Sequence, residues 1–360
     1  MSVISRRLDC QQLKVRRFIR PEELIRWMGC IQAQDFAGAR WGIGCRLGHA
    51  AEGVGATGIW TDAAIQREFD EGRFLRLHIL RPTWHFVLAE DVRWMLELTA
   101  SRIKAGAAGY RRQLELDPAV FRRSHGVLVK ALEGGQMKTR GELMAELNKA
   151  KILTNETRLG HLLMEAELDK LLCSGPLRGK QFTYMLLEER APVGKSLMRE
   201  EAVGELVFRY FSSRGPATLQ DFAWWSGLTV ADGRLGVEVN GRRLVKEELD
   251  GQVYYSTGGE GGKGDEKGVW VLPPFDEYSV AYTDRGLILP RGYKPEDSMG
   301  ALKPLLIRDG KVAGSWQRSF RKKEVEVEVE LVRSMGDRAL KNAFKKYGLF
   351  LEKELTFKKR

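Results

Sequence analysis

The sequence predicts an α+β protein in which three units repeat one order of elements before a strand-rich C-terminal segment. Apolar residues at helical spacing alternate with short alternating stretches that are typical of paired strands. Two or three short helices followed by a β-hairpin occur three times before about residue 262. Beyond that point the alternating pattern dominates, and we expect a small β-barrel or sheet there.

Four domains follow from this pattern: residues 1–115, 116–197, 198–262 and 263–360. The glycine-rich stretch 258–268 offers almost no side chains to pack, and it predicts a flexible hairpin tip or linker. Helix, turn, helix, helix and hairpin in the second unit is the order of a winged helix, whose third helix or hairpin contacts DNA. The units share this pattern without a strict sequence repeat.

The composition is that of a folded protein with a basic surface. Of 360 residues, 43% are hydrophobic and 30% charged, and the formal net charge is +11. This excess of Lys and Arg favours a polyanionic partner, nucleic acid first and an anionic membrane surface second. An enzyme that is merely basic remains an alternative.

The cysteines and the apolar stretches indicate the cellular compartment of the protein. Four scattered cysteines without a C-x-x-C pair disfavour a disulfide scaffold and a zinc ribbon. The N-terminal residues lack an apolar core of signal-peptide length, and no eighteen apolar residues run together. We therefore expect no membrane span and a cytoplasmic, nucleoid-associated protein.

Local signals place the elements of the first two units. Pro21 opens a helix, Thr61 caps another, and the turn at Arg81 and Pro82 joins two strands. In the second unit, Thr139 and Glu142 form a capping box. The expected elements there are helices at 127–132, 139–150 and 157–175, the last ending at a glycine, and a hairpin within 177–192.

The remaining elements follow from the same signals. Helices are expected at 199–215, 216–228 with Thr218 as cap, and 229–240, which two glycines make a poor helix. Strands are expected at 242–249, 252–257, 269–274, 277–282 and 324–332, strands joined by a hairpin turn at Asp309 and Gly310 within 304–316, and a last, basic helix at 336–360. Glutamates and valines alternate from Glu324, so one strand face should be acidic and point to water.

Two glutamines, Gln32 and Gln34, stand at the end of an apparently amphipathic stretch in the first unit. On an α-helix their spacing turns the side chains about 200° apart, so both cannot face one pocket. In an extended backbone, positions two apart point the same way. They are either surface residues on a helix or a pair of amides aimed into one cleft.

The usual catalytic signatures are absent. The sequence has no H-E-x-x-H, no phosphate-binding loop, no G-x-S-x-G and no dinucleotide fingerprint after a strand. The five histidines are too spread for a metal site, and those in the first hairpin, His78 and His85, are expected to be packed or solvated. We expect neither a metal ion nor a cofactor.

Six motifs in register, "RRLDCQQL", "IQAQDF", "RLHILRPTWHFV", "GPATLQDFAWWSGL", "VLPPFDEYSVAYTDR" and "GKVAGSWQR", resemble those of the AlkZ/YcaQ family of bacterial winged-helix DNA glycosylases. The resemblance runs nearly end to end. It implies three tandem winged-helix domains that form a concave DNA channel, followed by a C-terminal β-barrel.

The resemblance also implies an activity and its residues. Family members carry Gln-Φ-Gln or Gln-Φ-Asp in the first domain, with Φ apolar, and this sequence has Gln32-Ala33-Gln34. Such enzymes hydrolyse the N-glycosidic bond of alkylated guanine, including guanines in interstrand cross-links. Gln32 and Gln34 are then the expected catalytic pair, and the enzyme is expected to be a monofunctional monomer on double-stranded DNA.

Other residues have weaker expected roles. Asp35 and His85 are possible catalytic support, although Asp35 is first expected to end a helix or pair with an arginine. Arg16, Arg17, Arg178 and Lys180 are expected DNA contacts. Trp224 and Trp225 are expected in the core, and Phe275 and Asp276 in structural roles. A non-catalytic winged-helix regulator is the alternative function, and a nuclease is disfavoured because no carboxylate cluster is evident.

Overall fold

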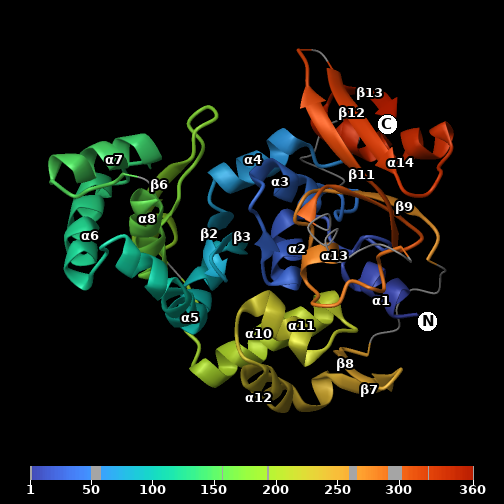
Figure 1. Ribbon diagram of the computed structural model, residues 1–360, viewed down its shortest axis with the longest axis horizontal. Helices are drawn as coiled ribbons and strands as arrows, with labels where there is room; N and C mark the ends of the chain where they lie inside the picture. The colour runs from blue at the N-terminus through green and yellow to red at the C-terminus, as the bar shows by residue number, and fades with distance from the viewer. Residues whose placement is uncertain are drawn as a thin grey trace. The chain divides into compact units, whose positions relative to one another are not determined.

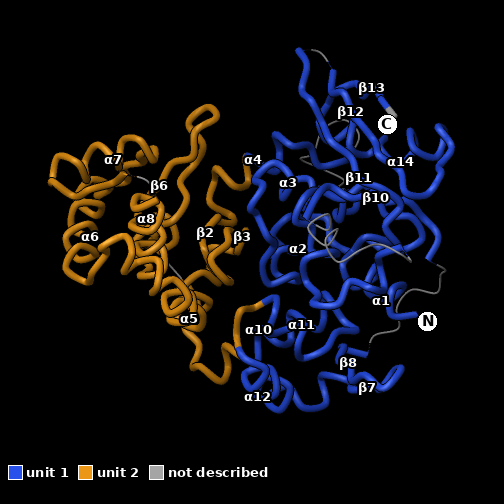
Figure 2. Tube along the Cα trace, viewed as in Figure 1, with its two compact units in different colours: residues 1–66, 204–225, 229–360 blue, residues 67–203, 226–228 orange. Residues whose placement is uncertain are grey.

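The computed structural model describes residues 2–49, 58–155, 157–192, 194–258, 266–290, 302–322 and 324–359, with the elements shown in Figure 1. They form two compact units (Figure 2): residues 1–66, 204–225 and 229–360, and residues 67–203 with 226–228. Most of the predicted linker, residues 259–265, lies outside the described part. The division into four domains remains a prediction.

The N-terminal part of unit 1 consists of short helices around one two-residue strand. They are α1 (Val3–Cys10), α2 (Pro21–Met28), β1 (Ile31–Gln32), α3 (Phe36–Gly44) and α4 (Asp62–Asp70), which continues into unit 2. Pro21 opens α2 as predicted, and the Glu23 carboxylate accepts from the N–H groups of Ile19 and Arg20. Thr61 Oγ1 accepts from the N–H of Ala64 at 3.2 Å, which confirms its capping role.

The chain returns to unit 1 within a third helical group. Its elements are α10 (Arg199–Arg214), α11 (Leu219–Ser226), α12 (Val230–Asn240), the short η2 (Gly241–Arg243), β7 (Val245–Leu249) and β8 (Gln252–Ser256). Thr218 and Thr229 each form a capping box, which confirms the predicted start of α11. A Cβ on Gly233 would lie 3.1 Å from Leu219 and Phe222, so glycine lets α12 approach α11 closely.

The two adjacent tryptophans of α11 have different environments. Trp225 is fully buried, as expected for a core residue. Trp224 is 45% exposed, and its indole N–H donates to the carbonyl of Val280. Because neighbours on a helix point about 100° apart, only one of them can face the core, and the prediction that both are core residues is wrong for Trp224.

The C-terminal segment forms the expected strand-rich layer. It contains β9 (Val269–Leu272), α13 (Glu277–Val280), β10 (Leu305–Arg308), β11 (Lys311–Phe320), β12 (Glu324–Leu331), α14 (Asp337–Leu351) and β13 (Glu354–Lys359). The strands make one sheet in the order β13-β12-β11-β10-β9 (Figure 1), parallel only between β12 and β13. Val325, Val327 and Val329 are fully buried while the alternating glutamates are not, which confirms the predicted two-faced strand.

Two predictions for this segment are wrong. Residues 277–282 are not a strand, because the Asp276 carboxylate accepts from the N–H of Tyr278 and begins α13. Residues 336–360 are not one helix, because α14 ends at Leu351 and Glu352 adopts a left-handed conformation. Residues 354–359 form β13, where Lys358 Nζ lies 3.1 Å from Glu326.

Unit 2 contains the first hairpin and the second helical group. The elements are β2 (Phe74–Leu80), β3 (Thr83–Leu88), η1 (Ala89–Asp91), α5 (Val92–Gln113), α6 (Pro118–Leu132), β4 (Lys138–Thr139), α7 (Arg140–Lys149), α8 (Arg158–Leu168), β5 (Leu172–Ser174), β6 (Thr183–Leu186) and α9 (Leu187–Arg190). Strands β2 and β3 pair antiparallel, and a second sheet has the order β4-β6-β5. A leucine-rich core of α6, α7, α8, β5 and β6 holds the second group together.

The predicted hairpin and capping box of unit 2 are confirmed, but three helices differ from the prediction, one of them α6, which begins at Pro118 instead of Val127. Arg81 has a positive φ in the turn between β2 and β3, and Thr139 caps α7 with Glu142. The 22-residue α5 was not predicted, and α8 ends at Leu168 instead of Gly175. Lys170 has φ +61°, which breaks the helix and lets residues 172–174 pair with β6.

Lys346 of α14 predicts a specific dependence of stability on pH. Its ammonium group donates to the carbonyls of Cys45 and Leu47, and burial, followed by nearby Arg16, lowers its pKa to about 7. Between about pH 7 and 10 the unfolded chain therefore binds more protons at this site, and the free energy of unfolding should rise with pH. Urea unfolding at about pH 7 and pH 9 measures this rise, and Lys346→Met should reduce it. An identical pH slope in the variant would refute the assignment.

Candidate active site

The segment with the two glutamines links two helices; its backbone is extended at Ile31 and Gln32 and bends at Gln34. Helix α2 ends at Gly29, whose φ of +76° suits glycine, and β1 follows at Ile31–Gln32. The next helix, α3, begins only at Phe36. The two glutamines are therefore not on one helix, and the geometric objection to a shared pocket does not apply.

The three residues of the motif differ in exposure. Ala33 is fully buried, Gln32 is 7% exposed and Gln34 is exposed. A fully buried position between two helices favours a small side chain, which accounts for alanine as the apolar residue of the motif. One carboxamide thus comes from the protein interior and the other from its surface.

A buried ion pair fixes the backbone of this segment. Glu277 accepts from the N–H of Gln32 at 2.8 Å, from Arg214 Nε and Nη2 at 3.0 and 2.7 Å, and from the indole N–H of Trp225 at 3.1 Å. Arg214 also donates to the carbonyls of Met28 and Cys30. Both charged side chains are almost fully buried. The pair therefore holds the end of α2 and the start of β1 together.

The preceding residue, Asp276, forms a second buried pair. Its carboxylate accepts from Arg46 Nη1 and Nη2 at 2.8 and 2.7 Å. Arg46 also donates to the carbonyls of Gln11 and Gly42. Burial acts to lower the pKa of Arg46, but Asp276, Cys45 and Glu277 together outweigh it and the pKa is raised. Asp276 has the structural role expected from the sequence.

Asp35 ends the segment as a helix cap. Its carboxylate accepts from the N–H of Gly38 at 2.6 Å, which begins α3, and lies 3.8 Å from the guanidinium of Arg318. Both interactions agree with the primary expectation for this residue. Its carboxylate is therefore already engaged in structure.

The other sequence candidates lie in different places. His85 belongs to unit 2, where it is buried in β3 with Nδ1 2.9 Å from the carbonyl of Thr83. Arg16 and Arg17 are exposed in unit 1, and Arg16 donates to the carbonyl of Cys45. The structure thus assigns His85 to a different unit from the glutamine pair.

The hairpin tip between β5 and β6 carries the two remaining candidates. Lys180 is exposed. Arg178 Nη1 lies 2.7 Å from Glu142 Oε1, and its Nη2 donates to the carbonyl of Met137. The Glu142 carboxylate also accepts from the N–H of Thr139, and this bond, followed by Arg178, lowers the pKa of Glu142 to about 2. Glu142 thus neutralises much of the charge of Arg178.

The residues that the structure describes contain no group of three or more His, Cys, Asp or Glu side chains suited to a metal ion. Within the same described ranges, none of the helices combines the length and the apolar character needed to cross a membrane.

Comparison with known proteins identifies the family. A family model described as DNA glycosylase AlkZ-like matches residues 25–350. The chain therefore belongs to the AlkZ-like DNA glycosylase family, which confirms the resemblance of its motifs.

Two relatives come from Streptomyces sahachiroi. A protein named "Interstrand DNA cross-link repair glycosylase" is 26% identical over 268 residues, which is 67% of each chain. The solved structure of the DNA glycosylase AlkZ has a TM-score of 0.79 and 20% identity, covering 99% of this chain and 98% of that chain. At this identity the structural match shows that the fold is shared.

The two residues that position the glutamines were not predicted from the sequence. Glu277 and Arg214 lie 245 and 182 positions after Gln32, and only the acidic pair after Pro273 and Pro274 gave a signal. Two consecutive acids in an otherwise apolar stretch indicate buried partners, because a buried carboxylate requires a compensating charge.

Glu277→Gln should destabilise the protein strongly. The substitution leaves Arg214 buried without its counter-charge, which typically costs about 3–5 kcal/mol. The free energy of unfolding in urea measures the effect. The matched control is Glu330→Gln, at an exposed position of β12. Its free energy of unfolding should lie within about 0.5 kcal/mol of that of the parent protein. Equal stability of both variants would contradict the role of the ion pair.

Proposed function

We propose that this chain is a DNA repair glycosylase that hydrolyses the N-glycosidic bond of cationic N7-alkylguanine lesions, including those in interstrand cross-links. The observation that carries the proposal is the non-helical Gln32-Ala33-Gln34 segment, fixed at the Gln32 backbone by a buried ion pair in a chain of the AlkZ-like family. The related cross-link repair glycosylase supports this substrate class.

The chemistry of the lesion explains how amides can serve as the catalytic groups. An N7-alkylated guanine already carries a positive charge, so it leaves without a general acid. The remaining task is to position a water near C1′ and to stabilise the oxocarbenium-like centre that develops there. The carboxamide oxygens of Gln32 and Gln34 accept the hydrogens of this water and direct negative dipole ends toward the cation.

The absence of a carboxylate from the motif restricts the substrates. A carboxylate base contributes roughly 10²–10⁴ in rate, and an amide cannot take a proton in this way. Asp35 does not replace it in the proposal, because its carboxylate caps α3. The enzyme therefore depends on an activated leaving group, and unmodified bases survive.

Binding of the polyanionic substrate follows from the charge. The net charge of +11 and the exposed Arg16, Arg17 and Lys180 suit contacts to DNA phosphates. We assign Arg178 a smaller contribution because it is paired with Glu142. The protein acts as a monomer in the cytoplasm, close to the nucleoid.

Excision of N7-methylguanine from a duplex tests the function. Single-turnover release of the base should be readily measured with the parent protein, and Gln32→Ala and Gln34→Ala should each lower its rate by roughly 10²-fold. Gln34→Asp, which restores an acceptor and adds a base, should excise faster than Gln34→Ala. Binding of the lesion duplex should stay within a few-fold of the parent.

The possible failures of this experiment are distinct. Tight binding without excision by the parent protein would overturn the glycosylase and favour a non-catalytic DNA-binding protein. If neither alanine substitution affects excision, the glycosylase activity is still supported, but the glutamine pair is rejected as its catalytic residues.

The salt dependence of DNA binding tests the phosphate contacts. Lys180→Ala should weaken duplex binding and reduce the slope of log affinity against log salt by about 1, because one fewer counterion is released. Arg178→Ala should change the slope less, because Glu142 already pairs with it. Fluorescence anisotropy at several salt concentrations measures both. A larger effect of Arg178→Ala would contradict this assignment.

A further inference from the structure

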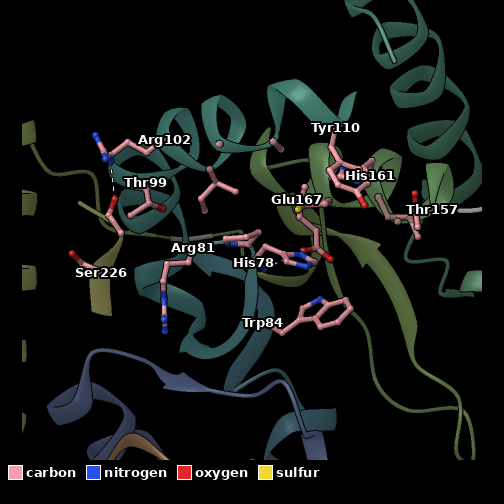
Figure 3. Close-up of a pocket in the computed structure, with 18 of the residues that line it drawn as sticks. His78, Arg81, Trp84, Thr99, Arg102, Tyr110, Thr157, His161, Glu167 and Ser226 are labelled. Atoms are coloured by element: carbon pink, nitrogen blue, oxygen red, sulfur yellow. Dashed lines mark hydrogen bonds and ion pairs between the residues drawn. The ribbon is translucent and has the colours of Figure 1, made fainter. Parts of the chain in front are cut away.

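Unit 2 contains a cavity of about 690 Å³ that the proposed glycosylase chemistry does not use. Its walls come from the β2–β3 hairpin, α5, α8 and residues 226–228, all within this unit (Figure 3). The volume lies in the range of small-molecule and cofactor sites, about 300–1,000 Å³.

A histidine and a glutamate form the polar part of the cavity. His78 Nδ1 lies 2.6 Å from Glu167 Oε2, which also accepts from the backbone N–H of His78 at 3.1 Å. A carboxylate can only accept, so Nδ1 carries the proton and Nε2 is an acceptor in the neutral ring. These two hydrogen bonds use His78 Nδ1, its backbone N–H and Glu167 Oε2, and they leave Nε2 and Glu167 Oε1 outside them. The cavity therefore presents two acceptors and needs a ligand with two donors.

Flat side chains supply much of the wall. The Trp84 ring lies 4.5 Å from the His78 ring, and Tyr110 stacks on His161 at 5.8 Å with an angle of 24° (Figure 3). Burial, followed by nearby Arg111, lowers the pKa of His161. Aromatic walls of this kind favour a planar heterocycle, which gains stacking contacts with them.

The charges that line the cavity favour an anionic group on the same ligand. Arg81, Arg102 and Arg140 lie along it, and Glu167 is the one carboxylate among the described lining residues. Arg102 is held by a hydrogen bond from Nε to the carbonyl of Gly227 at 2.7 Å. Arg81 and Arg102 both lie beside Gly227, and two positive charges there suit a phosphate, whereas Arg140 lies beside Gly160.

We propose that this cavity binds a guanine nucleotide, with the guanine N1–H and N2–H donated to Glu167 and His78 and the phosphate near the arginines. Guanine is the nucleobase with two adjacent donors on its pairing edge. Adenine and cytosine offer one donor group beside an acceptor, and thymine offers one donor between two acceptors. The ligand is either a free nucleotide or an unpaired guanine in a DNA strand. This inference goes beyond the proposed bond hydrolysis and does not rest on it.

Calorimetric titration of the full chain with dGMP tests the site. We expect saturable binding of one dGMP, with dAMP and dCMP weaker by about tenfold or more, since each would leave an acceptor unpaired. Deoxyguanosine should also bind more weakly than dGMP, because it lacks the phosphate. Equal affinity for dAMP and dGMP, or no binding of dGMP at millimolar concentration, would overturn the proposal.

Two glycines of α5 provide a matched pair of variants. A Cβ added to Gly106 or to Gly109 would meet no atom within 4 Å, so both positions tolerate a side chain. Gly106 lines the cavity and Gly109 does not. Gly106→Leu should therefore fill the cavity and lower the affinity for dGMP at least tenfold, while Gly109→Leu should bind dGMP with the affinity of the parent protein. Undiminished binding by Gly106→Leu would place the dGMP elsewhere and refute the site.

Glu167→Gln tests the hydrogen-bonding logic. The amide has the size of the carboxylate but presents a donor group, so the preference for dGMP over dAMP should fall by about tenfold or more. An unchanged preference in a variant that remains folded by circular dichroism would refute recognition by Glu167. A single-stranded oligonucleotide with one guanine separates the two sources of ligand: tighter binding than dGMP indicates a DNA strand, and equal binding indicates the free nucleotide. N7-methylguanine excision, measured in parallel, reports separately on the glycosylase.

Discussion

The buried pair of Arg214 and Glu277 is the interaction on which the candidate active site depends. Two opposite charges removed from water are stable only while they compensate each other and have their hydrogen bonds satisfied. Here the carboxylate and the guanidinium use their further hydrogen bonds on the backbone of residues 28–32. Because the two buried charges must remain paired, they hold the backbone of the segment that carries the glutamines in one position.

The neighbouring pair extends this principle. Consecutive acids, Asp276 and Glu277, neutralise two different buried arginines, Arg46 from the region after α3 and Arg214 from the end of α10. One dipeptide therefore connects three parts of unit 1 that are distant in the sequence. Because each arginine also donates to main-chain carbonyls, the site rests on backbone contacts in addition to packing.

Local signals explain which elements could be predicted from the sequence. The Thr139–Glu142 box, the cap at Thr61 and the turn at Asp309 and Gly310 act within a few residues, and all appear in the structure. The glutamines were also found from a local pattern. The failures have non-local causes: residues 172–174 and 354–359 became strands because partner strands were available to pair with them. The contact of Glu277 with Gln32 spans 245 positions, and no local pattern encodes it.

The distance between the members of the ion pair along the chain has a consequence during synthesis. Arg214 leaves the ribosome 63 residues before Glu277, since 277 minus 214 is 63. At a translation rate of about 5–20 residues per second, several seconds pass before the carboxylate that compensates its guanidinium in the finished fold is synthesised. The nascent N-terminal region therefore cannot close its core early, and hydrolytic competence arises only when the later β-rich portion has been translated.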